Sequence, residues 1–264
     1  MSRNNVHFIS LGSGSKGNSF LVGFQEEYLM IDAGFSRKEL VKRLAEAEIE
    51  PKSIKAVLIT HDHEDHVKGC RVFCDSYKIP AYVSFKSANY LGEPERNKLP
   101  KKVREFESGN AFMINDFMVL PFSVQHDSID AVGFTFEIAN KKVGIATDIG
   151  SLNLLAKQRL HDCDILVIES NYDLDMLREA NRPMQLKRRI MGKFGHLGNI
   201  ECLEALEHLI TERTKNLCLV HLSEDCNDFE IVKDLATMKL GILKRSDITL
   251  EIAKQNSIGK LLYC

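Results

Sequence analysis

The sequence feature that most constrains the fold is a cluster of histidines and aspartates directly after an apolar run. Residues 56–59 read Ala-Val-Leu-Ile, an apolar run of strand length, and the chain continues as Thr-His-Asp-His-Glu-Asp-His over 60–66. Gly69 follows, where a helix can turn away from the strand. The pattern therefore predicts three histidines and two aspartates at the end of a strand.

The spacing within this cluster suits two metal ions. Alternate residues of an extended chain point to the same side, so His61 and His63 can share one ion. Asp65 and His66 are adjacent and project toward a second ion nearby. Neutral imidazole suits zinc and similar metals, and a carboxylate adds negative charge that helps hold two cations close together. The alternative is a solvated turn rich in His and Asp by chance, which the number of histidines disfavours.

Thr-His-x-His-x-Asp-His after a hydrophobic strand resembles the signature of the metallo-β-lactamase superfamily of hydrolases. The resemblance implies an α/β fold, a four-layer αβ/βα sandwich, with the metals in a cleft at the edge where the two sheets meet. It also implies three further ligands downstream, for which His126, Asp148 and His221 are the candidates. His126 follows an apolar run at 117–122, which favours the same strand-end placement.

The resemblance gives each of these residues a role. One metal site would contain His61, His63, His126 and Asp148, and the other would contain Asp65, His66, His221 and Asp148. Asp148 would bridge the ions, and Asp65, Asp148 and His196 would act in the reaction. Asp32, in Asp-Ala-Gly after an apolar run, would order the metal loop without binding metal. The two divalent ions are expected to be Zn²⁺, Mn²⁺ or Fe²⁺, since all three accept these donors.

Length and composition set further expectations. At 264 residues the chain can bury one substantial core, and no repeat or linker divides it, so we expect a single domain over 1–264. It shows neither a signal-peptide pattern nor an apolar run of ~18 residues, so we expect no membrane partner and a cytoplasmic location. The seven cysteines lack a C-x-x-C pair, and we expect them to be reduced and mostly buried.

Periodicity predicts several helices around these sites. Ser36 and Glu39 form a capping-box pattern for a helix over about 36–48, and another helix is expected from Gly69 to about 77. Asn199 is expected to cap a helix whose apolar residues recur at helical spacing. A last helix near 229–238 is expected to precede the final strand.

Three segments are candidates for contact with a substrate. The loop Gly-Ser-Gly-Ser-Lys-Gly-Asn-Ser at 12–19 can cradle an anion, through Ser15 and Asn18, or simply connect two strands. Residues 178–193 carry six basic residues and one acidic residue in a chain of net charge −2. This run, with Lys187, Arg188 and Arg189 as the substrate-binding candidates, is either a phosphate-binding surface or a solvated helix face. His196 precedes a helix, where a phosphate oxygen is favoured.

The glycine loop and the segments 169–173 and 195–199 together look like the bacterial YycJ/WalJ group of the superfamily. That resemblance covers nearly the full chain and implies a 5′-to-3′ exonuclease on double-stranded DNA with a role in DNA repair. Lys16 and Gly198 depart from the usual pattern of the group. A small-molecule hydrolase of the same superfamily, acting on a cyclic phosphodiester or a thioester, is the alternative function. A metal-stabilised binding module is a third, less favoured reading because a complete two-metal set is costly to keep idle.

Overall fold

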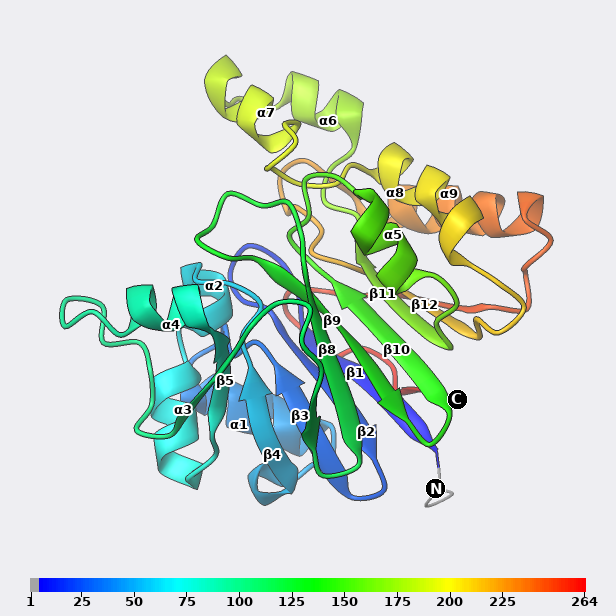
Figure 1. Ribbon diagram of the computed structural model, residues 1–264. Coiled ribbons are helices and arrows are strands. Elements are labelled where there is room, and N and C mark those ends of the chain that lie inside the picture. The colour runs from blue at the N-terminus through cyan, green and yellow to red at the C-terminus, as the bar shows by residue number, and fades with distance from the viewer. Residues whose placement is uncertain (1–4) are drawn as a thin grey trace.

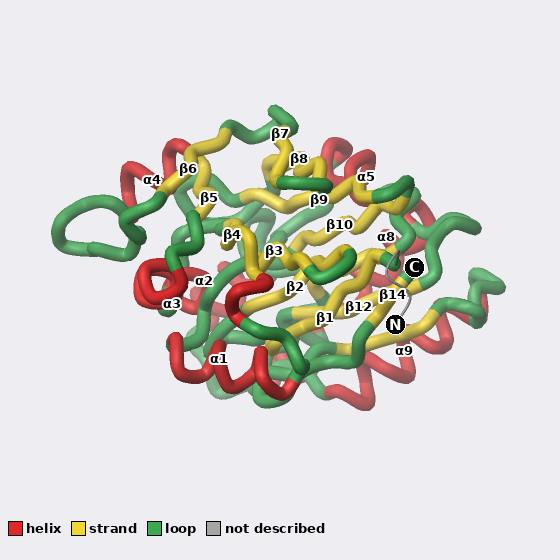
Figure 2. The backbone as a smooth tube through the Cα atoms, turned by 90° about the horizontal axis from the view of Figure 1, so that it is seen from below, coloured by secondary structure: helices red, strands yellow, loops and turns green. Residues whose placement is uncertain are grey.

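The computed structural model describes residues 5–264, so residues 1–4 of the predicted domain lie outside the described part. Two seven-stranded sheets pack face to face, with helices on their outer sides (Figures 1 and 2). The first sheet has the order β14 (Leu262–Tyr263), β1 (Val6–Gly12), β2 (Ser19–Phe24), β3 (Glu27–Ile31), β4 (Ile54–Leu58), β5 (Ala81–Ser84), β6 (Val103–Phe106). The second has the order β13 (Thr249–Ile252), β12 (Asn216–Val220), β11 (Ile165–Glu169), β10 (Lys141–Ala146), β9 (Val132–Ile138), β8 (Phe117–Ser123), β7 (Phe112–Ile114).

The central strands, such as β4 and β11, read as nearly continuous apolar runs because both faces of each sheet are covered there. In β4, Ala56 and Leu58 enter the core between the sheets, whereas Val57 enters the core under the helices. The helices on the first sheet are α1 (Arg37–Glu46), α2 (Glu64–Val67), α3 (Cys70–Tyr77) and α4 (Phe85–Leu91). The second sheet is covered by α5 (Leu154–Leu160), α8 (Asn199–Leu209) and α9 (Phe229–Ile242). These layers confirm the predicted four-layer α/β sandwich.

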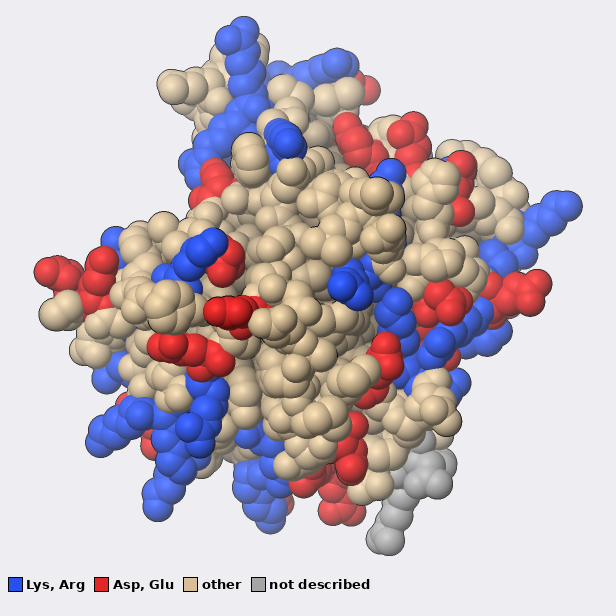
Figure 3. Space-filling model, viewed as in Figure 1, with Lys and Arg blue, Asp and Glu red and all other residues tan. Residues whose placement is uncertain are grey.

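Two short helices, α6 (Leu174–Glu179) and α7 (Met184–Ile190), lie apart from the layers at the top of Figure 1. They form a helical arm, residues 174–190, between β11 and α8. In Figure 3, Lys and Arg side chains gather on this projection. The basic run of the sequence therefore belongs to a protruding element and not to a helix that covers a sheet.

The functional segments converge because of strand direction. Strands β3 to β6 are parallel to one another, as are β10 to β13, so their carboxyl ends meet at one edge of each sheet. The loop after β3 braces the loop after β4, since the backbone N–H of Ala33 donates to the carbonyl of His66 at 2.8 Å. Gly34 is required at this contact, because a Cβ there would lie 1.7 Å from the carbonyl oxygen of Asp65.

Some local expectations were inexact. The helix expected over 36–48 is Arg37–Glu46, and the one expected to end near 238 continues to Ile242. Asn199 does not cap α8 as predicted. It is the first helical residue, with Gly198 as the cap, because its buried amide oxygen accepts from the Ser170 hydroxyl at 2.7 Å.

The structure also bears on the expected absence of a membrane span and on the state of the cysteines. No helix within residues 5–264 has the length and apolar character needed to cross a membrane. Six of the seven cysteines are buried, and Cys264 is half-buried. The described part of the chain contains no disulfide, as predicted.

Candidate metal centre

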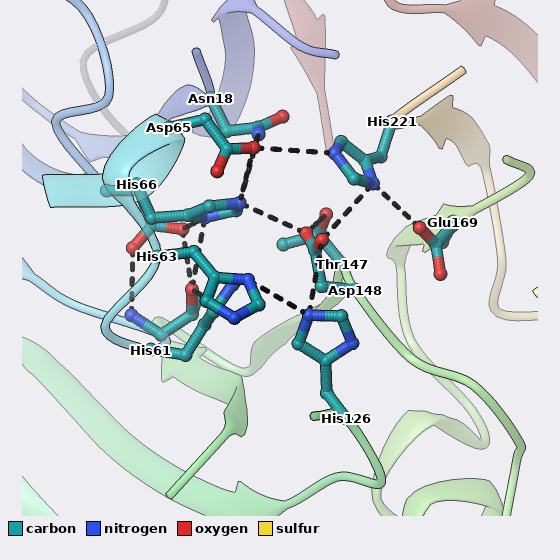
Figure 4. Close-up of polar contacts among 12 residues, drawn as sticks. Asn18, His61, His63, Asp65, His66, His126, Thr147, Asp148, Glu169 and His221 are labelled. Atoms are coloured by element: carbon teal, nitrogen blue, oxygen red, sulfur yellow. Dashed lines mark hydrogen bonds and ion pairs between the residues drawn. The ribbon is translucent and has the colours of Figure 1, made fainter. Parts of the chain in front are cut away.

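The seven residues predicted as metal ligands meet where the two sheets come together (Figure 4). His61 and His63 follow β4, and Asp65 and His66 lie in α2. The second sheet supplies the remaining three from the segments after β8, β10 and β12, namely His126, Asp148 and His221. The ligand atoms fall into overlapping groups, including His61–His63–His126 and Asp65–His66–His221, whose members lie within 4.8 Å of one another.

Each of the five histidines has one ring nitrogen held by an acceptor outside this cluster. His66 Nδ1 bonds Asp32 Oδ2 at 2.7 Å, and His126 Nδ1 bonds the carbonyl of Gly195 at 3.0 Å. The corresponding partners of the other three are Thr60 Oγ1 at 3.0 Å from His61 Nδ1, the Asp127 carbonyl at 3.3 Å from His63 Nε2, and Glu169 Oε1 at 2.7 Å from His221 Nδ1. Such outer bonds fix the orientation of metal-binding imidazoles and leave the other nitrogen for the ion.

The inner ring nitrogens are where metals fit. His61 Nε2 and His221 Nε2 are buried and have no hydrogen-bond partner within residues 5–264. A buried polar atom without a partner is costly, unless a ligand satisfies it. His66 Nε2 lies 3.2 Å from Asp148 Oδ2, and His126 Nε2 lies 3.8 Å from Asp148 Oδ1. Asp148 therefore lies between the two predicted sites, as a bridging carboxylate must.

The electrostatics of the centre favour cations. Burial opposes ionisation of Asp148, but the neighbouring His221 and His66 hold its pKa well below the ordinary value. Burial also opposes a charge on His66, yet Asp148, Asp32 and Asp65 raise its pKa well above the ordinary value. In contrast, burial and the neighbouring His66 lower the pKa of His61, which keeps its imidazole neutral as metal binding requires.

Asp32 lies beside the metal-binding groups and is completely buried. Its Oδ1 accepts from the backbone N–H of Thr60 at 2.8 Å, and its Oδ2 accepts from the Thr60 hydroxyl at 2.7 Å as well as bonding His66. All three of these hydrogen bonds are thus directed at the segment that carries the histidines. This arrangement fits the predicted ordering role.

Glu169 is a functional candidate that sequence reasoning missed. This completely buried residue ends β11, and its Oε1 lies 2.8 Å from His196 Nδ1 and 2.7 Å from His221 Nδ1. Its Oε2 accepts from the backbone N–H groups of Ile149 at 2.9 Å and Leu197 at 3.0 Å. An acid at the end of a buried apolar strand was the available signal, because the predicted ligands also lie near strand ends.

His196 is held at the edge of the centre by this carboxylate. Because its Nδ1 bonds Glu169, Nε2 is the ring atom left for the pocket that His196 helps to line. Burial opposes a charge on this ring, but Glu169 and Asp148 raise its pKa above the ordinary value. The ring can therefore present an N–H to an anion in the pocket.

A pocket of about 260 Å³ opens over the centre. Its wall contains predicted ligands, polar residues of the neighbouring loops and residues of the helical arm: Ser15, His63, Asp65, Asp127, Asp148, Asn171, Arg182, Leu186, Arg189, Ile190, Gly195, His196, His221 and Ser223. Most of the lining is polar, and two arginines of the arm face the carboxylates. The pocket thus has candidate metal ligands and two arginines side by side in its lining.

Only some of the predicted substrate-binding residues line the pocket. Ser15 and Arg189 line the pocket, whereas Arg188 is exposed on α7 outside the lining. Lys187 is only 7 % exposed, and its Nζ donates to the carbonyl of Arg178 at 2.5 Å, so it supports the arm from within. Asn18 is completely buried, and its Nδ2 lies 3.2 Å from Asp65 Oδ2 and 3.0 Å from His66 Nε2. Burial makes Asn18 a support for the metal-binding loop and not a surface for substrate.

The sequence matches a known family and curated relatives over most of its length. A family model described as "Beta-lactamase superfamily domain" matches residues 27–222. The chain is 34% identical over 235 residues to exodeoxyribonuclease YycJ of Bacillus anthracis, with 89% of this chain and 88% of that protein covered. It is 32% identical over 246 residues to exodeoxyribonuclease WalJ of Streptococcus pneumoniae, with 91% and 88% covered.

Solved structures agree on the fold. The metallo-β-lactamase fold protein YhfI from Bacillus subtilis superposes with a TM-score of 0.74 at 14% identity, covering 99% of this chain and 100% of that one. A diphosphatase of the PhnP family superposes with a TM-score of 0.69 at 17% identity, covering 98% and 97%. At such identities the likeness concerns architecture alone.

Proposed function

The chain belongs to the metallo-β-lactamase superfamily and is a metal-dependent hydrolase, and from this premise we propose that it is a 5′-to-3′ exodeoxyribonuclease on double-stranded DNA. We further propose that it acts in DNA repair, in the cytoplasm, and that residues 1–264 work as one domain. The candidate ligands are spread from residue 61 to residue 221, which supports the last point because both sheets are needed to assemble the centre.

The observation that carries the proposal is the orientation of the five histidines. Each has one nitrogen anchored outside the cluster and the other directed toward Asp148 or a neighbouring ligand, which suits two divalent ions that share this carboxylate (Figure 4). Zn²⁺, Mn²⁺ and Fe²⁺ are the proposed ions, since imidazole and carboxylate donors accept all three. When bound, such a pair supplies a nucleophile at neutral pH and offsets the negative charge that develops on the phosphate.

The residues of the chain contribute orientation and charge. Asp148 and Asp65 concentrate negative charge where the cations are needed, and Asp32 and Glu169 fix the rings of His66 and His221. His196, held by Glu169, is placed to donate an Nε2–H to an oxygen of the reacting phosphate. A charged donor is stronger than a neutral one, so its raised pKa supports this role.

Two observations support DNA as the substrate. Both curated relatives described above are named exodeoxyribonucleases, and alignment covers about nine-tenths of this chain. Arg182 and Arg189 in the pocket wall, with Arg188 exposed beside Arg189 on α7, suit contacts to phosphates on either side of the cleaved one. A small phosphodiester remains the second candidate, because about 260 Å³ is below the usual ~300–1,000 Å³ of ligand pockets and admits only a short part of a polymer.

Digestion of matched DNA substrates tests the proposal. A linear duplex with 5′-phosphates should be shortened progressively from its 5′ ends when the protein is loaded with Mn²⁺ or Zn²⁺, while a covalently closed circle of the same sequence stays intact. Asp148→Asn should abolish both this digestion and the hydrolysis of bis-p-nitrophenyl phosphate. Cleavage of the circle would make the enzyme an endonuclease. Intact linear DNA, with rapid hydrolysis of the small diester, would favour the small-molecule reading.

A further inference from the structure

The helical arm is fastened across the pocket by two ion pairs. Arg182 Nη2 lies 2.7 Å from Asp225 Oδ2, and Arg189 Nε lies 2.5 Å from Asp127 Oδ2. Asp225 belongs to the loop after β12, four residues beyond His221, whereas Asp127 directly follows His126. The two pairs therefore join one helical segment to loops on the two sides of the metal centre.

Both arginines line the pocket, and so does Asp127, which therefore holds Arg189 where a substrate phosphate would approach. Asp225 is not among the lining residues, but it occupies the guanidinium of Arg182. Each pair has one exposed and one partly buried member: Arg189 is 64% and Asp127 28% exposed, and Asp225 is 73% and Arg182 28% exposed. Exposed ion pairs are weak because water screens them and two long side chains lose freedom. A phosphate, which accepts two parallel N–H bonds from a guanidinium, can therefore replace either carboxylate.

We propose that Asp127 and Asp225 act as internal competitors of the substrate. They hold Arg182 and Arg189 over the pocket when it is empty, and two phosphates of a bound nucleic acid strand displace them together. This inference rests on the proposed nuclease function and adds the means by which a polymer is distinguished from a monomer.

The separation of the arginines provides the selectivity. Arg182 precedes α7, whereas Arg189 lies in its last turn, and each pairs with an aspartate of a different loop. A mononucleotide reaches only one arginine, and the other stays with its aspartate. The product of an exonuclease would thus lose its arginine contact to the returning carboxylate and leave.

Single substitutions on the Asp225 side test this competition. Asp225 is preferred to Asp127 because Asp127 Oδ1 lies 3.5 Å from the ring of His126, a candidate metal ligand. Asp225→Asn should lower KM for duplex DNA roughly two- to fivefold, the range that an exposed ion pair can supply. It should also strengthen inhibition by a free 5′-mononucleotide. Arg182→Gln should raise KM and reduce the slope of log affinity against log salt by ~0.9, the share of one phosphate contact.

Matched controls come from the same arm. Arg178 pairs with Asp175 at 3.4 Å but does not line the pocket, so Arg178→Gln and Asp175→Asn repeat the charge changes away from the site. Both should leave KM for DNA and turnover of bis-p-nitrophenyl phosphate unchanged, because neither residue lines the pocket. Thermal unfolding of each variant checks that the fold is intact.

The competition predicts opposite changes in KM for DNA: a decrease in Asp225→Asn and an increase in Arg182→Gln. If Asp225→Asn raises KM for DNA as Arg182→Gln does, the ion pair merely positions the arm, and the competition is refuted. Equal inhibition of wild type and Asp225→Asn by the mononucleotide would also refute it. If the wild type digests DNA but neither variant changes KM, this inference alone falls. If the wild type does not digest DNA, the proposed function falls with it.

Discussion

Replacement of Glu169 by glutamine is the sharpest test of how the centre is built. The carboxylate accepts from four groups: two backbone N–H groups, of Ile149 and Leu197, and the Nδ1 atoms of His196 and His221. Glutamine has the same shape but only one acceptor oxygen, and its NH₂ group donates. Whichever way the amide turns, two of the four donors face another donor.

The cost follows from these four bonds. Two charge-assisted hydrogen bonds contribute ~1.5–3 kcal/mol each. Part of this is recovered if the proton of His221 moves to Nε2, because Nδ1 then accepts from the amide. We expect Glu169→Gln to lower the free energy of unfolding by about 2–4 kcal/mol. The shifted proton occupies the nitrogen predicted to bind metal, so metal affinity should fall ~10–100-fold, as for the loss of other outer partners of metal-binding histidines.

Urea unfolding of the metal-free protein measures the first quantity, and metal content after dialysis against graded chelator concentrations measures the second. Glu137→Gln serves as the matched control, because Glu137 is exposed on β9 of the same sheet and should shift stability by less than ~0.5 kcal/mol. Wild-type stability together with wild-type metal retention in Glu169→Gln would refute the positioning role of Glu169.

Three further outcomes are expected. Asp148→Ala should lose metal and hydrolysis together, since the shared anionic ligand is removed, and an active protein with two ions per chain would contradict the bridging role. Asp32→Asn should bind metal ~10–100-fold more weakly while remaining folded, and complete loss of one ion in a titration would show that Asp32 is itself a ligand. Burial raises the pKa of Cys163 to about 12 and that of half-buried Cys264 to about 11. Because a raised pKa leaves less thiolate, we expect a disulfide reagent at pH 8 to label only Cys264, slowly and faster as pH rises, and rapid labelling of several native thiols would contradict this.

The cluster at 61–66 could be predicted from the sequence because the relevant information is local: an apolar strand followed by alternating histidines indicates which side chains point together. The strand-end position also favoured His126, whereas Asp148 and His221 were candidates through the resemblance. The four-layer fold was predicted in the same way, from a resemblance carried by those residues. Spacing alone could not say which histidine nitrogen faces inward, because the outer partners come from other strands.

Glu169 was missed because its partners are distant in the chain. Ile149 and His221 reach it through the parallel register of β10, β11 and β12, in which Ala146 pairs with Ile168 and Glu169 pairs with Val220. His196 reaches it from the loop before α8. Lys187 was wrongly expected to face the substrate. A count of charges includes it in the basic run, but its side chain is buried within the arm, where Nζ donates to the carbonyl of Arg178. Whether a residue of a short helix is buried depends on the segments that pack beside it, and a count of charged residues carries no information about them.

The backbone adds a constraint that links fold and site. Asp32, Asp148 and His221 all have left-handed backbone conformations, with φ of 60°, 51° and 58°. Residues other than glycine rarely adopt such angles, and each instance costs of order 1–3 kcal/mol. In all three cases the chain has just left a buried strand, and the turn directs the side chain toward the metal centre instead of continuing the pleat. Glycine would relieve this strain but would remove the carboxylate or imidazole. The candidate centre is therefore a region where local backbone preference yields to the placement of ligands, and the packed sheets on either side supply the stability that offsets the strain.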